Sequence, residues 1–203
     1  MSAALLSHPF ELRTARLILR APAEAHAEAL NAAVRESIAD LAPWMPWADH
    51  VPSLEETTTQ CRVAEADFRA GRDFRVHLFT ADGARIVGGT GVHRVRPEVP
   101  GCEIGYWVRS GESGKGYVTE AVRALVDLLW ETSPVRRIEM RMHSANVRSR
   151  AVPERLGFDL EGVLRADSRH VDGTLRDTCV YARVRGESPR SRAVGPGLQG
   201  VSS

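Results

Sequence analysis

The chain has 203 residues, of which 43% are hydrophobic, so a single domain with a full core is expected. Lys and Arg number 27 against 26 for Asp and Glu, which gives a formal net charge of +1. That balance excludes a general electrostatic attraction to nucleic acid or to an anionic membrane, and we expect neither as a direct partner. Any anion-binding site must therefore be local.

The three cysteines, Cys61, Cys102 and Cys179, lie far apart and form no CxxC pair that would indicate a zinc site or a redox motif. The N-terminus lacks the basic and apolar regions of a signal peptide, and no segment approaches the roughly 20 apolar residues of a membrane span. The seven histidines show no metal-ligand spacing, so we expect no metal and assign them no role beyond surface or packing. These features predict a reduced, cytoplasmic protein that is not exported.

Several local signals mark the expected secondary structure along the chain. Pro22 suits the first turn of a helix, because its missing amide has no helical partner there. Ser53 and Glu56 have the spacing of a capping box, and Asp82-Gly83 is a tight hairpin turn. We expect helices at 22–35, 53–70, 115–131 and 146–156. We expect strands at 16–20, 74–78, 86–95, 103–108 and 137–142, with two more around the Asp172-Gly173 turn.

This order of elements, βααβββαβαββ, predicts an α/β (α+β) domain at 12–185, built on one mixed sheet with helices on its faces. Residues 1–11 are expected to be a loose start. From Gly186 onward the chain is rich in Gly, Pro, Ser and Arg without any period, which predicts a flexible tail at 186–203. Residues 41–52, LAPWMPWADHVP, are expected to form an ordered loop.

The stretch RSGESGKGYVTE, residues 109–120, joins a strand to a helix through three glycines in six residues. Glycines allow close approach of the backbone to a ligand, and the free amides of a first helical turn suit phosphate oxygens. An anion cradle and a flexible turn with a capping glycine fit these glycines equally well. A Walker P-loop is excluded, because Arg109 stands at its first glycine position and Gly116 at its Ser or Thr position.

Residues 113–120, SGKGYVTE, resemble the acetyl-CoA pyrophosphate motif Q/R-x-x-G-x-G/A of GNAT acetyltransferases. Three further pieces resemble the RimJ/RimL-type branch of ribosomal-protein N-terminal acetyltransferases: the loop LAPWMPW, the strand EIGYW, and NVRSRAVPERLGF at 146–158. The similarity extends over roughly residues 12–185, in the family's order and spacing. Ser113 replaces the usual Gln or Arg, which main-chain binding should tolerate. Val118 replaces the last Gly or Ala and makes the turn tighter.

The resemblance implies a GNAT fold, with a largely antiparallel, twisted sheet of about seven strands that is splayed between the fourth strand (103–108) and the fifth (137–142). Acetyl-CoA would bind in that gap as the co-substrate. The residues implied in its binding are Val108, Ser113, Gly114, Lys115, Gly116, Tyr117, Val118, Thr119, Asn146 and Ser149. The implied acceptor is the N-terminus of a protein, and a homodimer is left open.

Glu103 lies in the middle of a strand, where glutamate is depleted, beside Ile104, Tyr106 and Trp107. Desolvation by such neighbours would make it a candidate general base. A modest base suffices for an α-amino group, whose reference pKa of about 7.7 to 8.0 lies far below the roughly 10.4 of lysine. An ion pair with one of the many arginines is an equal alternative.

Asn146 and Ser149 lie at the start of the expected helix 146–156, where Asn is a favoured N-cap. In the enzymes that the chain resembles, this Asn contacts the pantetheine arm and this Ser approaches the thioester sulfur. Ser149 is therefore the candidate donor to the departing thiolate, with a water molecule as its rival. Many GNAT enzymes use a tyrosine here, but no tyrosine lies within residues 146–158.

The candidate residues of the acceptor pocket are Trp44, Trp47, Trp107 and Glu103. The tryptophans are included because aromatic side chains make rigid walls for a peptide or small amine. The two loop tryptophans could equally cover the core or a dimer face. No cysteine or Ser-His-Asp pattern argues for an acyl-enzyme, so direct attack of a primary amine on acetyl-CoA is expected. The rival functions are acetylation of a small amine, such as an antibiotic or polyamine, and a non-catalytic acyl-CoA-binding module.

Overall fold

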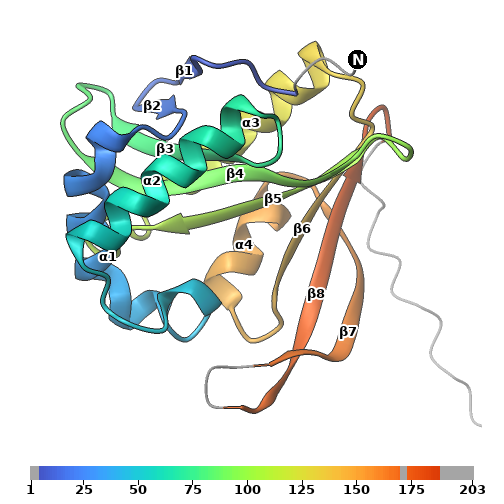
Figure 1. Ribbon diagram of the computed structural model, residues 1–203. Coiled ribbons are helices and arrows are strands. Elements are labelled where there is room, and N and C mark those ends of the chain that lie inside the picture. The colour runs from blue at the N-terminus through green and yellow to red at the C-terminus, as the bar shows by residue number, and fades with distance from the viewer. Residues whose placement is uncertain (1–4, 170–172, 188–203) are drawn as a thin grey trace, which may run out of the picture.

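The computed structural model describes residues 5–169 and 173–187, which form one eight-stranded sheet with helices on both faces (Figure 1). Across the sheet the strand order is β1-β2-β3-β4-β5-β6-β8-β7. The strands are β1 (Glu11–Arg13), β2 (Leu17–Arg20), β3 (Phe74–Thr80), β4 (Ile86–Arg96), β5 (Gly101–Val108), β6 (Arg137–His143), β7 (Asp159–Arg169) and β8 (Leu175–Val184). The predicted fold class is confirmed. The strand that the sequence missed is β1, whose three residues are too few to show a period.

The described helices follow the predicted order. They are η1 (Glu24–His26), α1 (Ala27–Leu41), η2 (Pro46–Ala48), α2 (Leu54–Arg69), η3 (Ser110–Glu112), α3 (Tyr117–Thr132) and α4 (Val147–Arg155). The predicted capping box begins α2: the Glu56 amide donates to Ser53 Oγ at 3.2 Å, and the Ser53 amide donates to the Glu56 carboxylate at 2.7 Å. The helix expected at 22–35 begins and ends later than predicted. Pro22 precedes it, η1 starts at Glu24, and α1 continues to Leu41 because its buried stripe extends that far.

Alternate residues of the central strands face two hydrophobic cores on opposite sides of the sheet. Leu17 and Leu19 of β2 belong to the larger core, which includes the apolar stripe of α3, whereas Ile18 between them packs with Ala33 of α1. Leu6 is also buried in the larger core, so this part of the segment expected to be loose is packed. Of the tail predicted at 186–203, residues 188–203 lie outside the described residues, as does Asp172 of the last predicted turn.

The sheet opens between β5 and β6, which run parallel to each other. Their pairing begins at Gly101 with Arg137 and ends at Glu103 with Glu139, after which the strands separate. β6 meanwhile stays paired with β8 as far as His143. We call this opening the β5–β6 gap. It is the splay predicted between strands 103–108 and 137–142. Beyond Glu103 and Glu139, the edges of β5 and β6 that face each other have no sheet partner.

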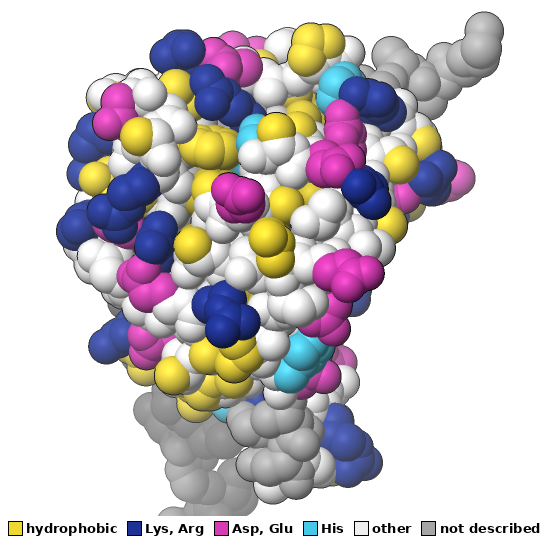
Figure 2. Space-filling view, turned by 60° about the vertical axis from the view of Figure 1, so that its left-hand side comes forward, with side chains coloured by type: hydrophobic (Ala, Val, Ile, Leu, Met, Phe, Trp, Pro, Cys, Tyr) yellow, Lys and Arg dark blue, Asp and Glu magenta, His cyan; other side chains and the backbone are white. Residues whose placement is uncertain are grey.

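The surface carries both signs of charge. On the face that includes α1 and α2, basic and acidic side chains are intermingled (Figure 2), as expected from a net charge of +1. None of the helices in the described part of the chain is long and apolar enough to cross a lipid bilayer.

Candidate active site

A cleft of about 1200 Å³ opens beside the β5–β6 gap. Its walls come from the end of β5, the first turn of α3, one side of α4, and the end of α1 with the loop that follows it. All ten residues predicted to bind acetyl-CoA line it: Val108, Ser113, Gly114, Lys115, Gly116, Tyr117, Val118, Thr119, Asn146 and Ser149. Segments that are far apart in the sequence are thus brought together on one cavity.

The anion cradle consists of residues 113–119. Gly114 and Gly116 both have a φ of +80°, in the left-handed region that glycine alone enters without strain. Gly116 is the N-cap of α3 and offers no side chain, so the amides of Tyr117, Val118 and Thr119 have no acceptor among the described residues. Free amides and the positive end of the helix dipole together suit phosphate oxygens. This geometry favours the cradle over the flexible turn.

The turn before β2 holds the cradle from one side. Arg16 Nη1 donates to the Lys115 carbonyl at 2.9 Å, and the same guanidinium forms an ion pair with Glu120 at 2.6 Å. Thr14 Oγ1 donates to Glu120 at 2.6 Å. Burial acts to raise the pKa of Glu120, but the hydrogen bonds from Thr14 and Arg16 outweigh it and leave the pKa below its usual range. Glu120 therefore stays ionised, and its contacts with Thr14 and Arg16 tie the first turn of α3 to the turn before β2.

A second carboxylate lies beneath the cradle. Glu112 is buried, with only 7% of its side chain exposed, and it pairs with Arg85 at 2.6 Å and with Lys115 Nζ at 2.7 Å. A buried carboxylate is stable only when it is paired. The one lysine of the chain is thereby placed at the cleft, which gives its position in the sequence a structural reason.

Helix α1 supports the loop that leads into the cradle. The amide of Ser110 donates to Ser37 Oγ at 2.9 Å, and the Ser110 hydroxyl donates to Asp40. Arg109 Nε donates to Glu36 at 2.7 Å, and this hydrogen bond lowers the pKa of the Glu36 carboxyl. The loop from Arg109 to Glu112 is therefore held by side chains from another element and is not free to flex.

Ser149 lies at the start of α4, where the predicted cap is present. Asn146 Oδ1 accepts a hydrogen bond from the Ser149 amide at 3.0 Å, so Asn146 both caps α4 and lines the cleft. Tyr106 of β5 reaches across the β5–β6 gap: its hydroxyl donates to the Ser149 carbonyl at 2.8 Å and accepts from Ser149 Oγ at 3.3 Å. Burial raises the pKa of Tyr106, which keeps its phenol protonated.

Tyr106 is a site residue that the sequence reasoning missed. No tyrosine lies within residues 146–158, and Tyr106 instead reaches Ser149 from strand β5. A usable signal was present, since Ile104, Tyr106 and Val108 alternate on one face of β5 and Val108 was already expected at the site.

The acceptor wall consists of Leu41, Trp44, Met45 and Trp107, which line the other end of the cleft. Trp44 and Trp107 therefore lie at the cleft, and their role in binding an acceptor stays a prediction. Trp47 does not line the cleft. Its ring meets the edge of Trp107 at a centroid distance of 6.1 Å, and 47% of the residue is exposed. Trp47 thus supports the wall from behind.

Glu103 is, with Trp47, one of two predicted site residues that lie outside the cleft. It does not line the cleft, and its carboxylate accepts a hydrogen bond from Arg94 Nη1 at 3.1 Å. This is the ion pair that the sequence left open as the alternative to a general base. Glu103 is also the last residue of β5 that pairs with β6, so it marks the start of the β5–β6 gap.

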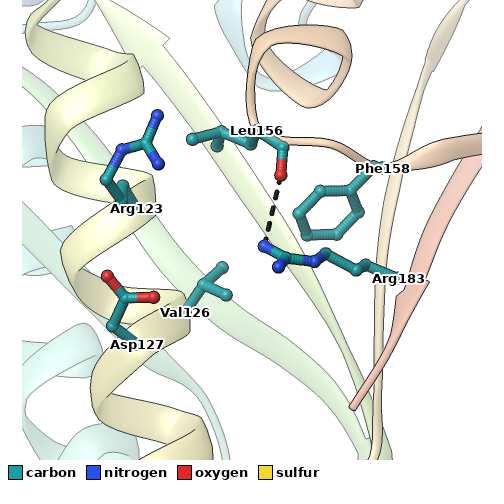
Figure 3. A pocket seen from close by; sticks show the side chains of 6 residues that line it. All are labelled: Arg123, Val126, Asp127, Leu156, Phe158 and Arg183. Atoms are coloured by element: carbon teal, nitrogen blue, oxygen red, sulfur yellow. Dashed lines mark hydrogen bonds between the residues drawn. The ribbon is translucent and has the colours of Figure 1, made fainter. Parts of the chain in front are cut away.

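The cleft also has a basic side that the sequence did not predict. Arg123 of α3 lines both the cleft and a separate cavity of about 10 Å³, enough for about one water molecule. Figure 3 shows that small cavity between α3, the end of α4 and β8, with Arg183 Nη1 donating to the Leu156 carbonyl at 3.2 Å. The small cavity is a packing defect behind the site.

No cluster of His, Cys, Asp or Glu within residues 5–169 and 173–187 could hold a metal ion.

A cradle of main-chain amides beside a gap between two strands defines a site for a long, phosphate-bearing co-substrate. The family model described as "Acetyltransferase (GNAT) domain" matches residues 16–159. The chain therefore belongs to the GNAT acetyltransferase family.

Individual similar proteins indicate which branch of the GNAT family the chain resembles. The ribosomal protein uS5-alanine N-acetyltransferase of Escherichia coli (strain K12) is 30% identical over 174 residues, which are 84% of this chain and 89% of that protein. The putative ribosomal N-acetyltransferase YdaF of Bacillus subtilis (strain 168) is 38% identical over 86 residues, 42% of this chain and less than half (46%) of YdaF. A structure of RimL, a ribosomal L7/L12 alpha-N-protein acetyltransferase, in complex with coenzyme A has a TM-score of 0.80 and 25% identity, covering 86% of this chain and 98% of that one. The chain is thus similar to RimJ/RimL-type enzymes.

Proposed function

We propose that this acetyltransferase moves the acetyl group of acetyl-CoA to the N-terminal α-amine of a protein or peptide. The observation that carries the proposal is the division of one cleft into an anion cradle and an aromatic acceptor wall, with Ser149 of α4 lining the same cleft and in contact with Tyr106 of β5. The names of the uS5 and RimL relatives point to the same class of acceptor. The cysteines of the chain are free and buried, and we place the reaction in the reducing cytoplasm.

The residues of the cleft fit acetyl-CoA, which supplies the activated acetyl group. The free amides of the cradle would hold its pyrophosphate, and Gly116 leaves room for it, since the nearest atom to a Cβ built there is Arg16 Nη2 at 3.6 Å. The unpaired edges of β5 and β6 offer amides and carbonyls to the polar groups of an extended arm. These contacts come from the main chain and would position the thioester without any acyl-enzyme.

The acidic residues of the cleft favour a single amine over a polyamine. Asp40 accepts from Ser110, Glu112 pairs with Arg85 and Lys115, and Glu120 pairs with Arg16. Two of the three carboxylates that line the cleft are therefore neutralised by Arg or Lys side chains, and Asp40 alone keeps an unpaired charge, which is little to bind the several cationic groups of a polyamine. An α-amine is also the easier nucleophile at neutral pH, because its reference pKa of about 7.7 to 8.0 is well below the roughly 10.4 of a lysine side chain.

The reaction is direct attack of the neutral amine on the thioester carbonyl carbon. Ser149 donates a hydrogen bond to the departing sulfur, and Tyr106 keeps the Ser149 hydroxyl at the gap through the 3.3 Å contact. Ser149 comes from α4 and Tyr106 from β5. The site works only when β5 and α4 are both in place.

The test is release of free thiol from acetyl-CoA across a panel of amines. Peptides that begin with free Ala or Ser should be acetylated, whereas the same peptides with a blocked N-terminus and an internal lysine should not. Preferred turnover of a polyamine or an antibiotic would give the small-amine function instead. A thermal shift with acetyl-CoA but no turnover with any amine would indicate a non-catalytic binding module.

A further inference from the structure

Asp73 and His93 form a hydrogen-bonded pair on the side of the sheet that carries Trp107. Asp73 directly precedes β3, and its Oδ1 is the partner of His93 Nδ1 on β4. Arg75 Nε donates to the other carboxylate oxygen at 2.9 Å. Burial acts to raise the pKa of Asp73, but the hydrogen bonds from His93 and Arg75 outweigh it and leave the pKa below its usual range. An ionised Asp73 keeps the proton of His93 on Nδ1 and leaves Nε2 as the acceptor.

Glycines create the space for the imidazole ring. A Cβ built at Gly91 would lie 2.8 Å from His93 Nε2, and one built at Gly105 would lie 3.4 Å from the same atom. The ring therefore lies over both glycines. The same holds one row along the sheet, where a Cβ at Gly89 would lie 2.4 Å from Trp107 Nε1.

The register of β4 and β5 places this ring relative to the cleft. Gly89 pairs with Trp107, Gly91 with Gly105, and His93 with Glu103. Side chains of alternate residues share a face, so His93 Nε2 occupies the row between Glu103 and Trp107. Glu103 is where β5 leaves β6, and Trp107 lines the cleft. Nε2 thus lies over Gly105 of β5, two residues along the strand from Trp107. His93 does not itself line the cleft, so a water molecule must connect Nε2 with an amine there. Nε2 has no hydrogen-bond partner among the described residues.

We propose that His93, oriented by Asp73, is the general base for the acceptor amine; this inference rests on the proposed function. The incoming ammonium passes one proton through a water molecule to Nε2, which releases it to solvent. The neutral nitrogen then forms the C–N bond as the C–S bond breaks. Its second proton replaces the one that Ser149 gives to the sulfur, so the products are the amide and the free thiol of coenzyme A.

The charges around the imidazole fit this role. Asp73 and Arg75 face it from β3 and the residue before it, and Glu103 lies opposite it on β5, paired with Arg94. The Asp73 carboxylate stabilises the imidazolium that forms when Nε2 takes a proton. Because Arg94 holds Glu103, the carboxylate nearest in register does not compete for Nε2.

The decisive experiment replaces His93 in two ways. His93→Gln keeps a side chain that can donate to Asp73 but cannot take up a proton, and His93→Ala leaves a hole over Gly91 and Gly105. Both variants should lose about 100- to 10,000-fold in kcat, the usual range for general acid-base catalysis. Both should keep the acetyl-CoA thermal shift and the KM for acetyl-CoA, and added imidazole should restore turnover of His93→Ala but not of His93→Gln.

Two controls keep the outcome clear. His50→Ala removes the histidine of another Asp–His pair, which lies on an exposed loop with Asp49, and it should leave kcat unchanged. The wild-type enzyme in the same assay tests the proposed function by itself, since its inactivity would defeat that function whatever the variants do. With an active wild type, near-normal turnover of His93→Gln would overturn the inference. So would a loss in His93→Ala that imidazole does not reverse.

Discussion

The two ends of the cleft are built in different ways. The anion cradle binds through its main chain. It is held by charged side chains from the turn before β2 (Arg16), from α1 (Glu36) and from the turn before β4 (Arg85). The acceptor wall consists of apolar side chains that rest on ring contacts, such as Trp44 against His143 at 5.5 Å. From this comparison we expect the donor end to be rigid and generic, and the acceptor end to take its selectivity from a few large side chains.

The largest expected effect comes from a substitution in the anion cradle at the donor end. Gly116→Asp should weaken acetyl-CoA binding by about 100-fold or more, because it removes at least two charge-assisted hydrogen bonds worth about 1.5 to 3 kcal/mol each and adds negative charge. Loss of the acetyl-CoA thermal shift measures this. Gly83→Asp is the control, since Gly83 has a similar φ of +74° in the β3–β4 turn. An undiminished shift in Gly116→Asp would place the cradle elsewhere.

Between the two ends lies Ser149, where we expect a loss of turnover without a loss of binding. Ser149→Ala should lower kcat by about 10- to 1000-fold, the range for one well-placed donor. The KM for acetyl-CoA should barely change. Asn146→Ala serves as a comparison, because it removes the helix cap and should lower the melting temperature as well. If Ser149→Ala and Asn146→Ala lost stability and turnover in the same proportion, Ser149 would be structural.

At the acceptor end we expect weaker binding of the acceptor without weaker binding of acetyl-CoA. Trp44→Ala should raise the KM for an acceptor peptide by about 10-fold or more, the usual size for a buried aromatic contact. The KM for acetyl-CoA should stay the same. Trp47→Ala should have a smaller effect, about two- to threefold, because Trp47 supports Trp107 from behind and is 47% exposed. A rise in the KM for acetyl-CoA as large as the rise in the KM for the acceptor in Trp44→Ala would contradict the division of the cleft.

The supports of the cradle should matter less than its backbone. Arg16→Gln removes the Arg16–Glu120 ion pair, in which Arg16 is 49% exposed, and exposed pairs contribute about 0 to 1 kcal/mol. Acetyl-CoA affinity should therefore fall by only about two- to fivefold, measured by calorimetry. Arg62→Gln, which removes an exposed pair with Glu24 elsewhere, should leave the affinity unchanged.

The smallest expected effect is that of Glu103→Gln. Because Glu103 pairs with Arg94 outside the cleft, turnover should stay within about twofold of the wild type across the pH range. A kcat profile between pH 6 and 9 is the measurement. A deficit that grows as the pH falls would return the role of base to Glu103, the other of the two alternatives that the sequence left open.

The donor end could be predicted from the sequence because main-chain binding needs glycines at fixed places. Gly114 and Gly116 left that signal, and the stripe of α3 and the capping box of α2 placed the surrounding helices. The alternation along β5 could place Tyr106 on the same face as Val108, but its contact with Ser149 depends on how far β5 lies from α4. The pairing of Glu103 with Arg94 likewise depends on strand register, which hydrophobic pattern alone does not fix at exposed positions.

The position of Lys115 also makes the cradle easy to label. The chain has 26 arginines but a single lysine, and that lysine lies at the cleft, paired with Glu112. An amine-reactive dye or cross-linker can therefore attach to this protein at only two kinds of group, the α-amine and Lys115. Bound acetyl-CoA should shield Lys115 from such a reagent. Peptide mass mapping of the labelled chain would then report occupancy of the donor site directly, without any engineered cysteine or tag.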